Sequence, residues 1–420
     1  MNLSVKSVCC IAFAAASVVL VPAASCSEGP DLDSLVREML QRNPAILAAR
    51  RAVDARKAAV SAASSLPDPG ISFETMGNLI PPTLQAGDPA SARVLKFTQE
   101  IPFPGKLDLQ GKIAAAGADV EYWKYEQIRR DLTAELKAAY YDLYLAQRTA
   151  EVIQKNKELL TQFVAVSEAR YKVGQAAQQD VLKAQVELTR LLEQQSVLGQ
   201  QQQTAQARIN SLLYRDPEIP LGTLPDLSRP KPDLKIDDLY AKALAGNPEV
   251  RMGRTEIDKS ELSVALARKS FYPDFEVGFS WFNRADMREM YGVMVKAKIP
   301  LYFWRKQRPE LEAATSEMLG ERYRYDSTLA NLYFRLKDPY LKAKTDAELL
   351  DLYSEAVIPQ ATLALESSLS SYRVGKVDFL SLLSNLATVL EYEVKYQEVL
   401  ADYHKSLVRL EFLSGEVLTP

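Results

Sequence analysis

Four short motifs occur twice along this chain, in the same order and about two hundred residues apart. The pairs are Asn43-Pro44 and Asn247-Pro248, Pro67-Asp68 and Pro273-Asp274, Ile101-Pro102 and Ile299-Pro300, and Tyr171-x-Val173-Gly174 and Tyr372-x-Val374-Gly375. Such a long period excludes a solenoid of small repeats and indicates a duplicated half-molecule. The sequence therefore predicts two copies of one supersecondary unit, over residues 26–215 and 233–420, joined by a proline-rich linker at 216–232.

Between the second and third motifs, each copy changes to the alternating pattern of β-strands. In the second copy, four apolar residues alternate with mostly polar neighbours: Phe275, Val277, Phe279 and Trp281. We expect strands over four ranges: about 70–80, 92–102, 274–282 and 291–300. Each copy is therefore predicted to hold one β-hairpin with an apolar face and a mostly polar face.

The remaining sequence predicts long helices. No proline interrupts the chain from Leu107 to Tyr171, and a continuous helix of this length would extend roughly 100 Å. After the Tyr-x-Val-Gly motif, apolar residues return at the three-and-four spacing of a coiled coil. Gly174 and Gly375 are predicted at the tips of two helical hairpins, because glycine adopts the left-handed backbone of a helix end at little cost.

Two β-hairpins supply four strands, which are too few to close a sheet whose outer face is apolar. Two chains would give eight strands, a barrel that side chains fill, and three would give twelve, enough for an aqueous lumen. The sequence therefore predicts an oligomer in a membrane. The alternative is one face of a soluble sandwich, which leaves helices of this length unexplained.

The N-terminal segment has the pattern of a secretory signal peptide, predicted over residues 1–25. One lysine precedes an apolar run from Val8 to Val21, and small residues follow. The run is shorter than the roughly 20 residues that span a bilayer. Cleavage after Ser25 would make Cys26 the first mature residue and a possible lipidation site, with ordinary signal cleavage as the alternative. One cysteine then remains, so no intramolecular disulfide is expected.

Composition excludes several classes of function. A net charge of −3 leaves no basic surplus for nucleic acid. The chain has one histidine, His404, in a helical stretch, and one cysteine outside residues 1–25, so a zinc site with Cys/His spacing cannot be assembled. The glycine-rich phosphate-binding and nucleophile motifs do not occur. We therefore expect no enzyme, with no catalytic residue, cofactor or metal site.

The chain resembles the TolC-like outer membrane efflux proteins, the outer membrane factors of tripartite efflux systems. Four stretches carry the resemblance: RYKVGQAAQQDVLKAQ at 170–185, SYRVGKVDFLSLLSNL at 371–386, QEIPFPGKL at 99–107 and IPLYFWRKQRPELEAA at 299–314. The resemblance implies a mainly α protein with a membrane β-barrel, built as a homotrimer with a twelve-stranded barrel on a long α-helical barrel. It also implies an outer membrane location with a periplasmic helical extension, docked to a periplasmic adaptor and an inner-membrane pump, with the 216–232 linker at the equator.

The resemblance also assigns candidate functional residues at the helix tips. Six residues become candidates for adaptor docking: Tyr171, Val173, Gly174, Tyr372, Val374 and Gly375. Their alternative role is plain turn chemistry. Asp180 and Tyr372 become gate candidates, because family members use matching positions in polar contacts between tips. Asp180 has an alternative role as the cap of a helix starting near Val181.

One departure from the family pattern concerns the entrance of the duct. Two positions that carry aspartate in some members are Ser381 and Ser384 in this chain. An acidic ring from the second copy is therefore not expected, although three copies of Asp180 could form one.

The predicted function is a passive exit duct for small molecules or metal cations delivered by the pump and adaptor. One alternative is the outer membrane component of a type I polypeptide secretion system. Another is a periplasmic coiled-coil adaptor or scaffold. An adaptor has a single helical hairpin flanked by β-rich domains, whereas this sequence predicts two.

Overall fold

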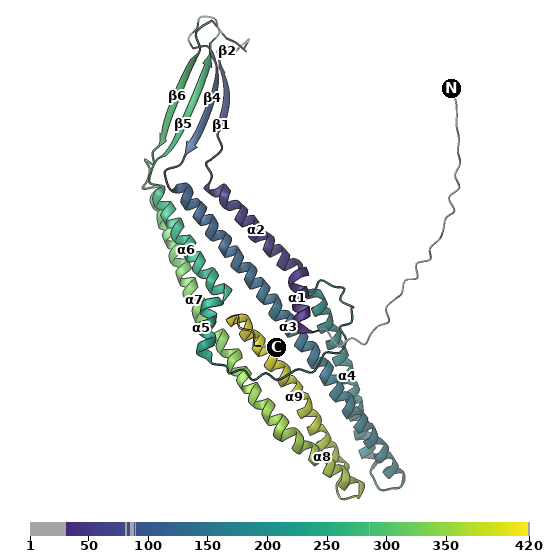
Figure 1. Cartoon of the computed structure of the whole chain (residues 1–420). Coiled ribbons are helices and arrows are strands. Elements are labelled where there is room, and N and C mark those ends of the chain that lie inside the picture. Colours follow the sequence, from purple (N-terminus) through teal and green to yellow (C-terminus); the bar gives the residue numbers. More distant parts are fainter. Residues whose placement is uncertain (1–30, 80–81, 85–87, 89, 285, 419–420) are drawn as a thin grey trace, which may run out of the picture.

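The chain forms an elongated rod with a β-sheet at one end and two helix tips at the other (Figure 1). This computed structural model describes residues 31–418, apart from 80–81, 85–87, 89 and 285. The predicted signal peptide and Cys26 lie outside the described residues. Helices account for most of the chain, as the sequence predicted.

Both halves of the chain place their elements in a similar order. The first half runs through α1 (Leu32–Arg42), α2 (Pro44–Ser64), β1 (Gly70–Met76), β2 (Asn78–Leu79), β3 (Pro82–Thr83), β4 (Ala92–Ile101), α3 (Lys106–Lys172) and α4 (Gln178–Leu212). The second half runs through α5 (Ile236–Gly246), α6 (Pro248–Lys269), β5 (Asp274–Asn283), β6 (Met290–Lys298), α7 (Gln307–Leu352), the π-helical turn η1 (Tyr353–Val357), α8 (Ile358–Arg373) and α9 (Phe379–Ser414).

The repeated Asn-Pro motif performs the same structural task in both halves. Asn43 caps α2 by accepting a hydrogen bond from the Ala45 amide at 2.9 Å, and its side-chain amide donates to the Leu212 carbonyl at 2.8 Å. Asn247 caps α6 in the same way and donates to the Leu413 carbonyl at 3.1 Å. Each buried asparagine thus joins the start of one helix to the end of another, and the following proline suits the first helical turn.

The main sheet is antiparallel, with the order β1-β4-β5-β6. The halves meet where β4 pairs with β5, so that Phe97 lies opposite Phe279, which in turn lies opposite Val293 on β6. Within the described part of the chain, β1 and β6 each pair with a single strand of this sheet. Two strand edges are therefore left unpaired at the sides of the sheet.

One face of the sheet exposes a row of large apolar side chains. The most exposed members are Ile71, Phe73, Tyr291, Val293 and Val295, at 68 to 75% of their full accessible area. Soluble monomers rarely leave so large an apolar area in contact with water. This face therefore requires a partner or a lipid environment.

The long helices form the body of the rod. The 67 residues of α3 extend about 100 Å and contact α2, α4, α6 and α9. In the second half the corresponding path is interrupted by η1, which ends two residues before Pro359. Proline provides no backbone N–H for the helix, which accounts for the irregular turn at this point.

The segment between the two halves crosses the middle of the rod and is fixed by hydrogen bonds to α3 and α9. Gln147 donates to the Gly222 carbonyl at 2.8 Å. The hydroxyl of Tyr403 donates to the Pro230 carbonyl at 2.6 Å, and the His404 Nε2 lies 3.0 Å from the Ser228 carbonyl oxygen. We call residues 216–232 the strap.

Candidate functional site at the helix tips

Each helical hairpin turns at a glycine with a left-handed backbone. Gly174 has φ of 73° and Gly375 has φ of 77°. The Gly174 amide donates to the Tyr171 carbonyl at 2.9 Å, and the Gly375 amide donates to the Tyr372 carbonyl at 3.0 Å. A side chain at either position would be strained by this backbone conformation, which explains why the repeated motif ends in glycine.

The two tip tyrosines have different surroundings although their motifs match. Tyr372 is buried, with 4% of its area exposed, and its ring lies 5.7 Å from that of Phe379. Its hydroxyl lies 3.4 Å from the Ser167 hydroxyl on α3, so it contacts the other hairpin. Tyr171 is 46% exposed. The hairpins pack on each other through Tyr372, which leaves Tyr171 free to contact another molecule.

Arg170 completes this contact between the hairpins. Its guanidinium donates to the Tyr372 carbonyl at 2.6 Å and lies 4.7 Å from the centre of the Tyr372 ring. The sequence around Arg170 does not predict this role, because nothing in the local pattern indicates a partner that is 202 residues away. Its only signal is its place directly before the repeated motif.

Asp180 is the third residue of α4, and the N-cap position belongs to Ala177. The interpretation of Asp180 as the helix cap was therefore wrong, because α4 begins earlier than predicted. Among the described residues, the hydrogen bonds that join Tyr372 to the first hairpin go to Ser167 and Arg170, and none joins it to the Asp180 carboxylate. One chain does not bring the two gate candidates together, so any contact between them has to involve a neighbouring copy.

The second tip carries a carboxylate, Asp378, that is not among the residues predicted from the sequence. Asp378 occupies the N-cap position of α9 and is exposed. It accepts a hydrogen bond from the Ser381 hydroxyl, and this bond holds the pKa of the carboxyl below its usual value. Asp378 therefore places a negative charge at the second tip, beside one of the two serines that replace aspartate.

The tip turns expose both apolar and basic side chains, the latter from Lys172, Arg373 and Lys376. Val173 and Val374 are 68% and 69% exposed. Further exposed apolar side chains follow on the adjoining turns of α4 and α9: Leu182, Val186 and Leu380. The exposed valines and leucines give a partner protein an apolar surface to bury, bordered by positive charge.

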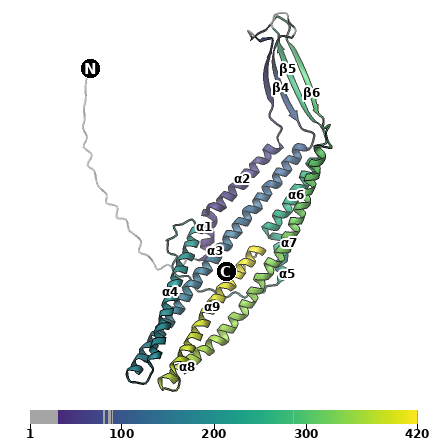
Figure 2. The ribbon, with the colours of Figure 1, turned by 180° about the vertical axis from the view of Figure 1, so that it is seen from behind.

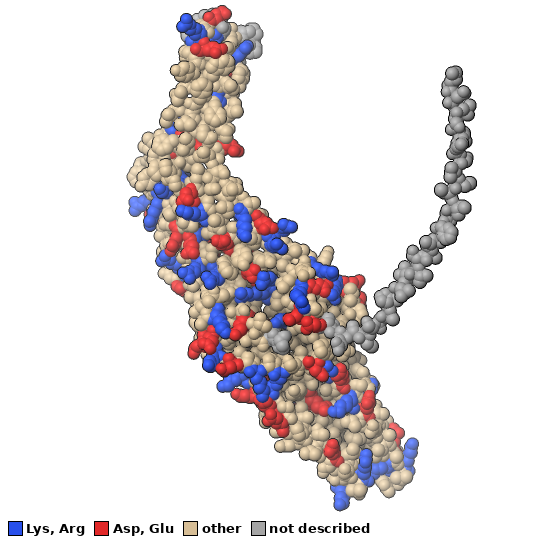
Figure 3. Space-filling model, viewed as in Figure 1, with Lys and Arg blue, Asp and Glu red and all other residues tan. Residues whose placement is uncertain are grey.

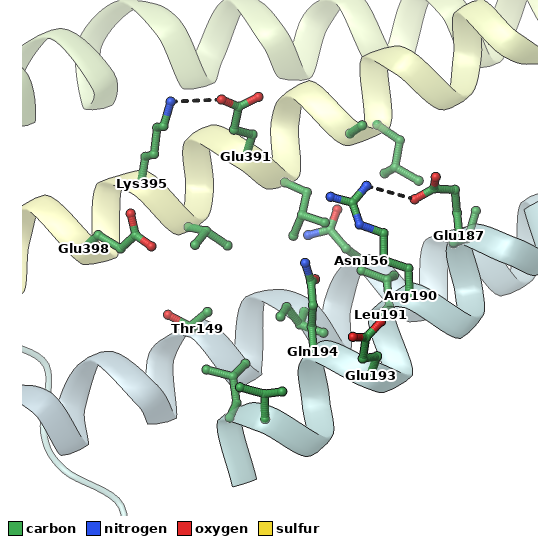
Figure 4. A pocket seen from close by; sticks show the side chains of 18 of the residues that line it. Thr149, Asn156, Glu187, Arg190, Leu191, Glu193, Gln194, Glu391, Lys395 and Glu398 are labelled. Carbon is green, nitrogen blue, oxygen red and sulfur yellow. Dashed lines mark hydrogen bonds and ion pairs between the residues drawn. The ribbon is translucent and has the colours of Figure 1, made fainter. Parts of the chain in front are cut away.

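A groove of about 720 Å³ lies between the hairpins, above the tips (Figure 4). Its sides come from α3, α4 and α9, and its floor is apolar, with Leu191 and Leu386 among its members. Ion pairs lie at its rim, such as Lys395 with Glu391 at 2.9 Å. Figure 2 shows the two hairpins side by side at this end of the rod. The groove therefore combines an apolar floor with a charged rim.

The fold is that of outer membrane channels of known structure. The outer-membrane channel OprN aligns with a TM-score of 0.80 and 19% identity, over 93% of this chain and 91% of OprN. The outer membrane protein VceC of Vibrio cholerae aligns with a TM-score of 0.78 and 16% identity, over 92% and 96%. The MtrE outer membrane channel of Neisseria gonorrhoeae aligns with a TM-score of 0.77 and 14% identity, over 93% of this chain and 90% of MtrE.

The chain belongs to the outer membrane efflux protein family, whose sequence profile matches residues 35–213 and 239–416. Protein CyaE of Bordetella pertussis is 21% identical over 217 residues, which cover 49% of this chain and 46% of CyaE. The family is one of outer membrane channels and not of enzymes, in agreement with the prediction. Among the described residues, no helix combines the length and apolarity needed to cross a bilayer.

Proposed function

We propose that three copies of this chain join their sheets edge to edge and close a twelve-stranded barrel in the outer membrane. The free edges of β1 and β6 support this proposal, because an unpaired edge cannot face lipid. In the barrel the apolar face would meet lipid. The opposite face would line the lumen with ion pairs such as Lys296 to Glu276 at 3.3 Å. Twelve strands leave room for water, whereas eight do not.

The helices would continue this barrel as a tube through the periplasm. Residues 1–25 would direct export, residues 26–215 and 233–420 would form the two repeats, and the strap would lie at the equator. Cys26 remains a candidate for lipidation. The chain would act as a passive exit duct, and an inner-membrane pump with its periplasmic adaptor would deliver the cargo. The observation that carries this proposal is that a sheet with an exposed apolar face continues directly into helices, of which α3 is about 100 Å long.

The helix tips would be both gate and docking surface. Tyr171, Val173 and Val374 are exposed and apolar or amphipathic, which suits contact with the adaptor. Gly174 and Gly375 would shape the tips. Tyr372 would hold the hairpins of one copy together, and Asp180 would contact a neighbouring copy. An adaptor that bound the separated tips more tightly would shift the duct toward its open state.

The cargo is proposed as small molecules or metal cations. A type I secretion role, with a polypeptide as cargo, is the second candidate, since the same duct geometry serves both. Among the described residues, no cluster of three metal-binding side chains occurs, so a metal cargo would pass without a resident site of that kind. Family membership favours the channel over the periplasmic adaptor or scaffold.

The experiment that tests this proposal combines mass and conductance. The protein purified from outer membranes in detergent should have three times the mass of the mature chain by light scattering. The same material should form water-filled channels in planar bilayers. A folded single subunit that remains in solution without detergent would contradict the proposal.

A further inference from the structure

An exposed aromatic segment lies where the sheet joins the helices. Between β6 and α7, residues 301–304 read LYFW, and their side chains are 49 to 70% exposed. The Trp304 ring contacts those of Tyr302 and Phe303 edge to face, at 6.0 and 5.2 Å. So many large apolar side chains in one exposed segment indicate a surface that meets another phase or partner.

A second aromatic group lies in neighbouring loops of the same junction. Phe103, between β4 and α3, stacks on Tyr272, between α6 and β5, at 4.5 Å. The ammonium of Lys269 lies 5.3 Å from the Phe103 ring and donates to the Pro104 carbonyl at 3.2 Å. Rings with an apolar body near a charged group are typical of the boundary between membrane and water. The junction thus carries aromatic groups on several adjoining loops.

Basic residues follow the aromatic segment directly. Arg305 and Lys306 are exposed, and within the described part of the chain neither forms an ion pair. Arg308 pairs with Glu312 at 3.2 Å. Figure 3 shows few charged side chains over the visible face of the sheet and many over the helices that begin below this junction. The positive charges of this segment therefore lie at the border of the apolar region.

The order of side chains along the chain matches the depth profile of a phospholipid leaflet. Val293, Val295 and Ala297 share one face of β6, and Ile299 continues this alternation. The aromatic segment comes next, and the cations follow. Acyl chains, the interfacial region and the phosphates are met in the same order on the way out of a bilayer.

We propose that residues 302–306 bind anionic phospholipid headgroups in the leaflet that faces the helices. The proposal rests on the proposed barrel and adds a lipid preference to it. The rings of Tyr302 and Trp304 would lie at headgroup level, and Arg305 and Lys306 would contact the lipid phosphates and the additional negative charge of an anionic headgroup. One basic residue near an anionic surface strengthens binding by about fivefold. Arg305 and Lys306 together should therefore bind an anionic headgroup clearly more tightly than a zwitterionic one.

Tryptophan fluorescence tests this proposal in the full-length trimer. A variant with Trp123→Phe and Trp281→Phe leaves Trp304 as the sole tryptophan. It is reconstituted into two sets of phosphatidylethanolamine vesicles. One set contains a minor fraction of brominated phosphatidylglycerol, and the other contains the same fraction of brominated phosphatidylethanolamine. Quenching of Trp304 should be stronger with the brominated phosphatidylglycerol. Arg305→Gln with Lys306→Gln should reduce that preference by roughly fivefold for each charge.

Two controls separate the possible results. Arg93→Gln with Arg288→Gln removes two exposed charges near the far end of the sheet and should leave the preference unchanged. If the Arg305/Lys306 variant does not assemble, the protein that keeps Arg305 and Lys306 is measured at higher salt concentration. Its preference for the anionic lipid should weaken, since salt screens exposed charges. Equal quenching by both lipids, or a preference that neither salt nor the variant changes, would overturn the proposal.

A companion variant with Trp281 as the sole tryptophan reports on the barrel itself. Trp281 lies on the apolar face of β5 and should be quenched by brominated chains of either lipid. Absence of this quenching would refute the membrane barrel. Quenching of Trp281 together with no lipid preference at Trp304 would refute the headgroup site alone.

Discussion

The Arg170 guanidinium lies 4.7 Å from the centre of the Tyr372 ring and also donates a hydrogen bond to the Tyr372 carbonyl at 2.6 Å. The two residues come from different halves of the duplication, so this contact ties the two hairpins of a single chain together at their tips. The contact is partly buried, which strengthens both the cation–π attraction and the charged hydrogen bond.

Arg170→Ala should loosen the tip and raise the conductance of single channels in planar bilayers. The loss of both interactions would cost about 2 kcal/mol, which shifts an open-closed equilibrium by roughly thirtyfold. Arg373→Ala is the matched control, because Arg373 is exposed at the end of α8. Conductance that Arg170→Ala leaves unchanged would show that the tie does not restrain the gate.

Asp180→Ala should also raise conductance if the Asp180 carboxylate contacts a neighbouring copy. If Asp180 only stabilises its helix, its loss should affect thermal stability and not conductance. Asp180 lies in the first turn of α4, where a negative charge stabilises the helix by about 0.3–1 kcal/mol. Asp180→Ala would then lower the thermal midpoint slightly and leave conductance unchanged. Measuring both quantities on Asp180→Ala and Asp180→Asn separates the two roles.

Acidification should destabilise the middle of the rod through His404. Burial lowers the pKa of His404 from 6.5 to about 4. Between these values the unfolded chain binds a proton at His404 that the folded chain does not, so the contribution of His404 to the free energy of unfolding is fully present above pH 6.5 and is lost as the pH falls toward 4. The loss across this window is about 3 kcal/mol.

His404→Gln provides the measurement, because glutamine does not titrate in this range and keeps a hydrogen-bond donor. The drop in thermal midpoint between neutral pH and pH values near 5 should be smaller in this variant than in the unaltered protein. Burial raises the pKa of Asp346 to about 6, and this carboxyl acts in the opposite direction, favouring the fold as the pH falls. An equal drop in both proteins would show that His404 is not responsible.

Asn43→Ala and Asn247→Ala should destabilise the chain by similar amounts. Each change removes a helix cap worth about 0.5–2 kcal/mol and leaves a carbonyl at the end of α4 or α9 without its donor. We expect losses of about 2 kcal/mol in chemical unfolding. Asn331→Ala, at an exposed position on α7, should change little. Very unequal losses would argue against equivalent roles for the two motifs.

Much of the architecture could be predicted because its signals are local. Alternation along Phe275 to Trp281 depends only on the pleat of a strand. The turns at Gly174 and Gly375 follow from the backbone conformations available to glycine. The start of α4 was misjudged because Ala177, which occupies the cap position, has no side chain that could signal a helix start.

The amino-acid sequence by itself determined the family, the mainly helical fold and the duplication of its motifs, because propensity and periodicity act over a few residues and repeat in both halves. Only the tertiary structure decided that Tyr372 is buried and Tyr171 exposed, and that Arg170 joins one hairpin to the other. These differences depend on contacts between residues about two hundred positions apart, which no local pattern encodes.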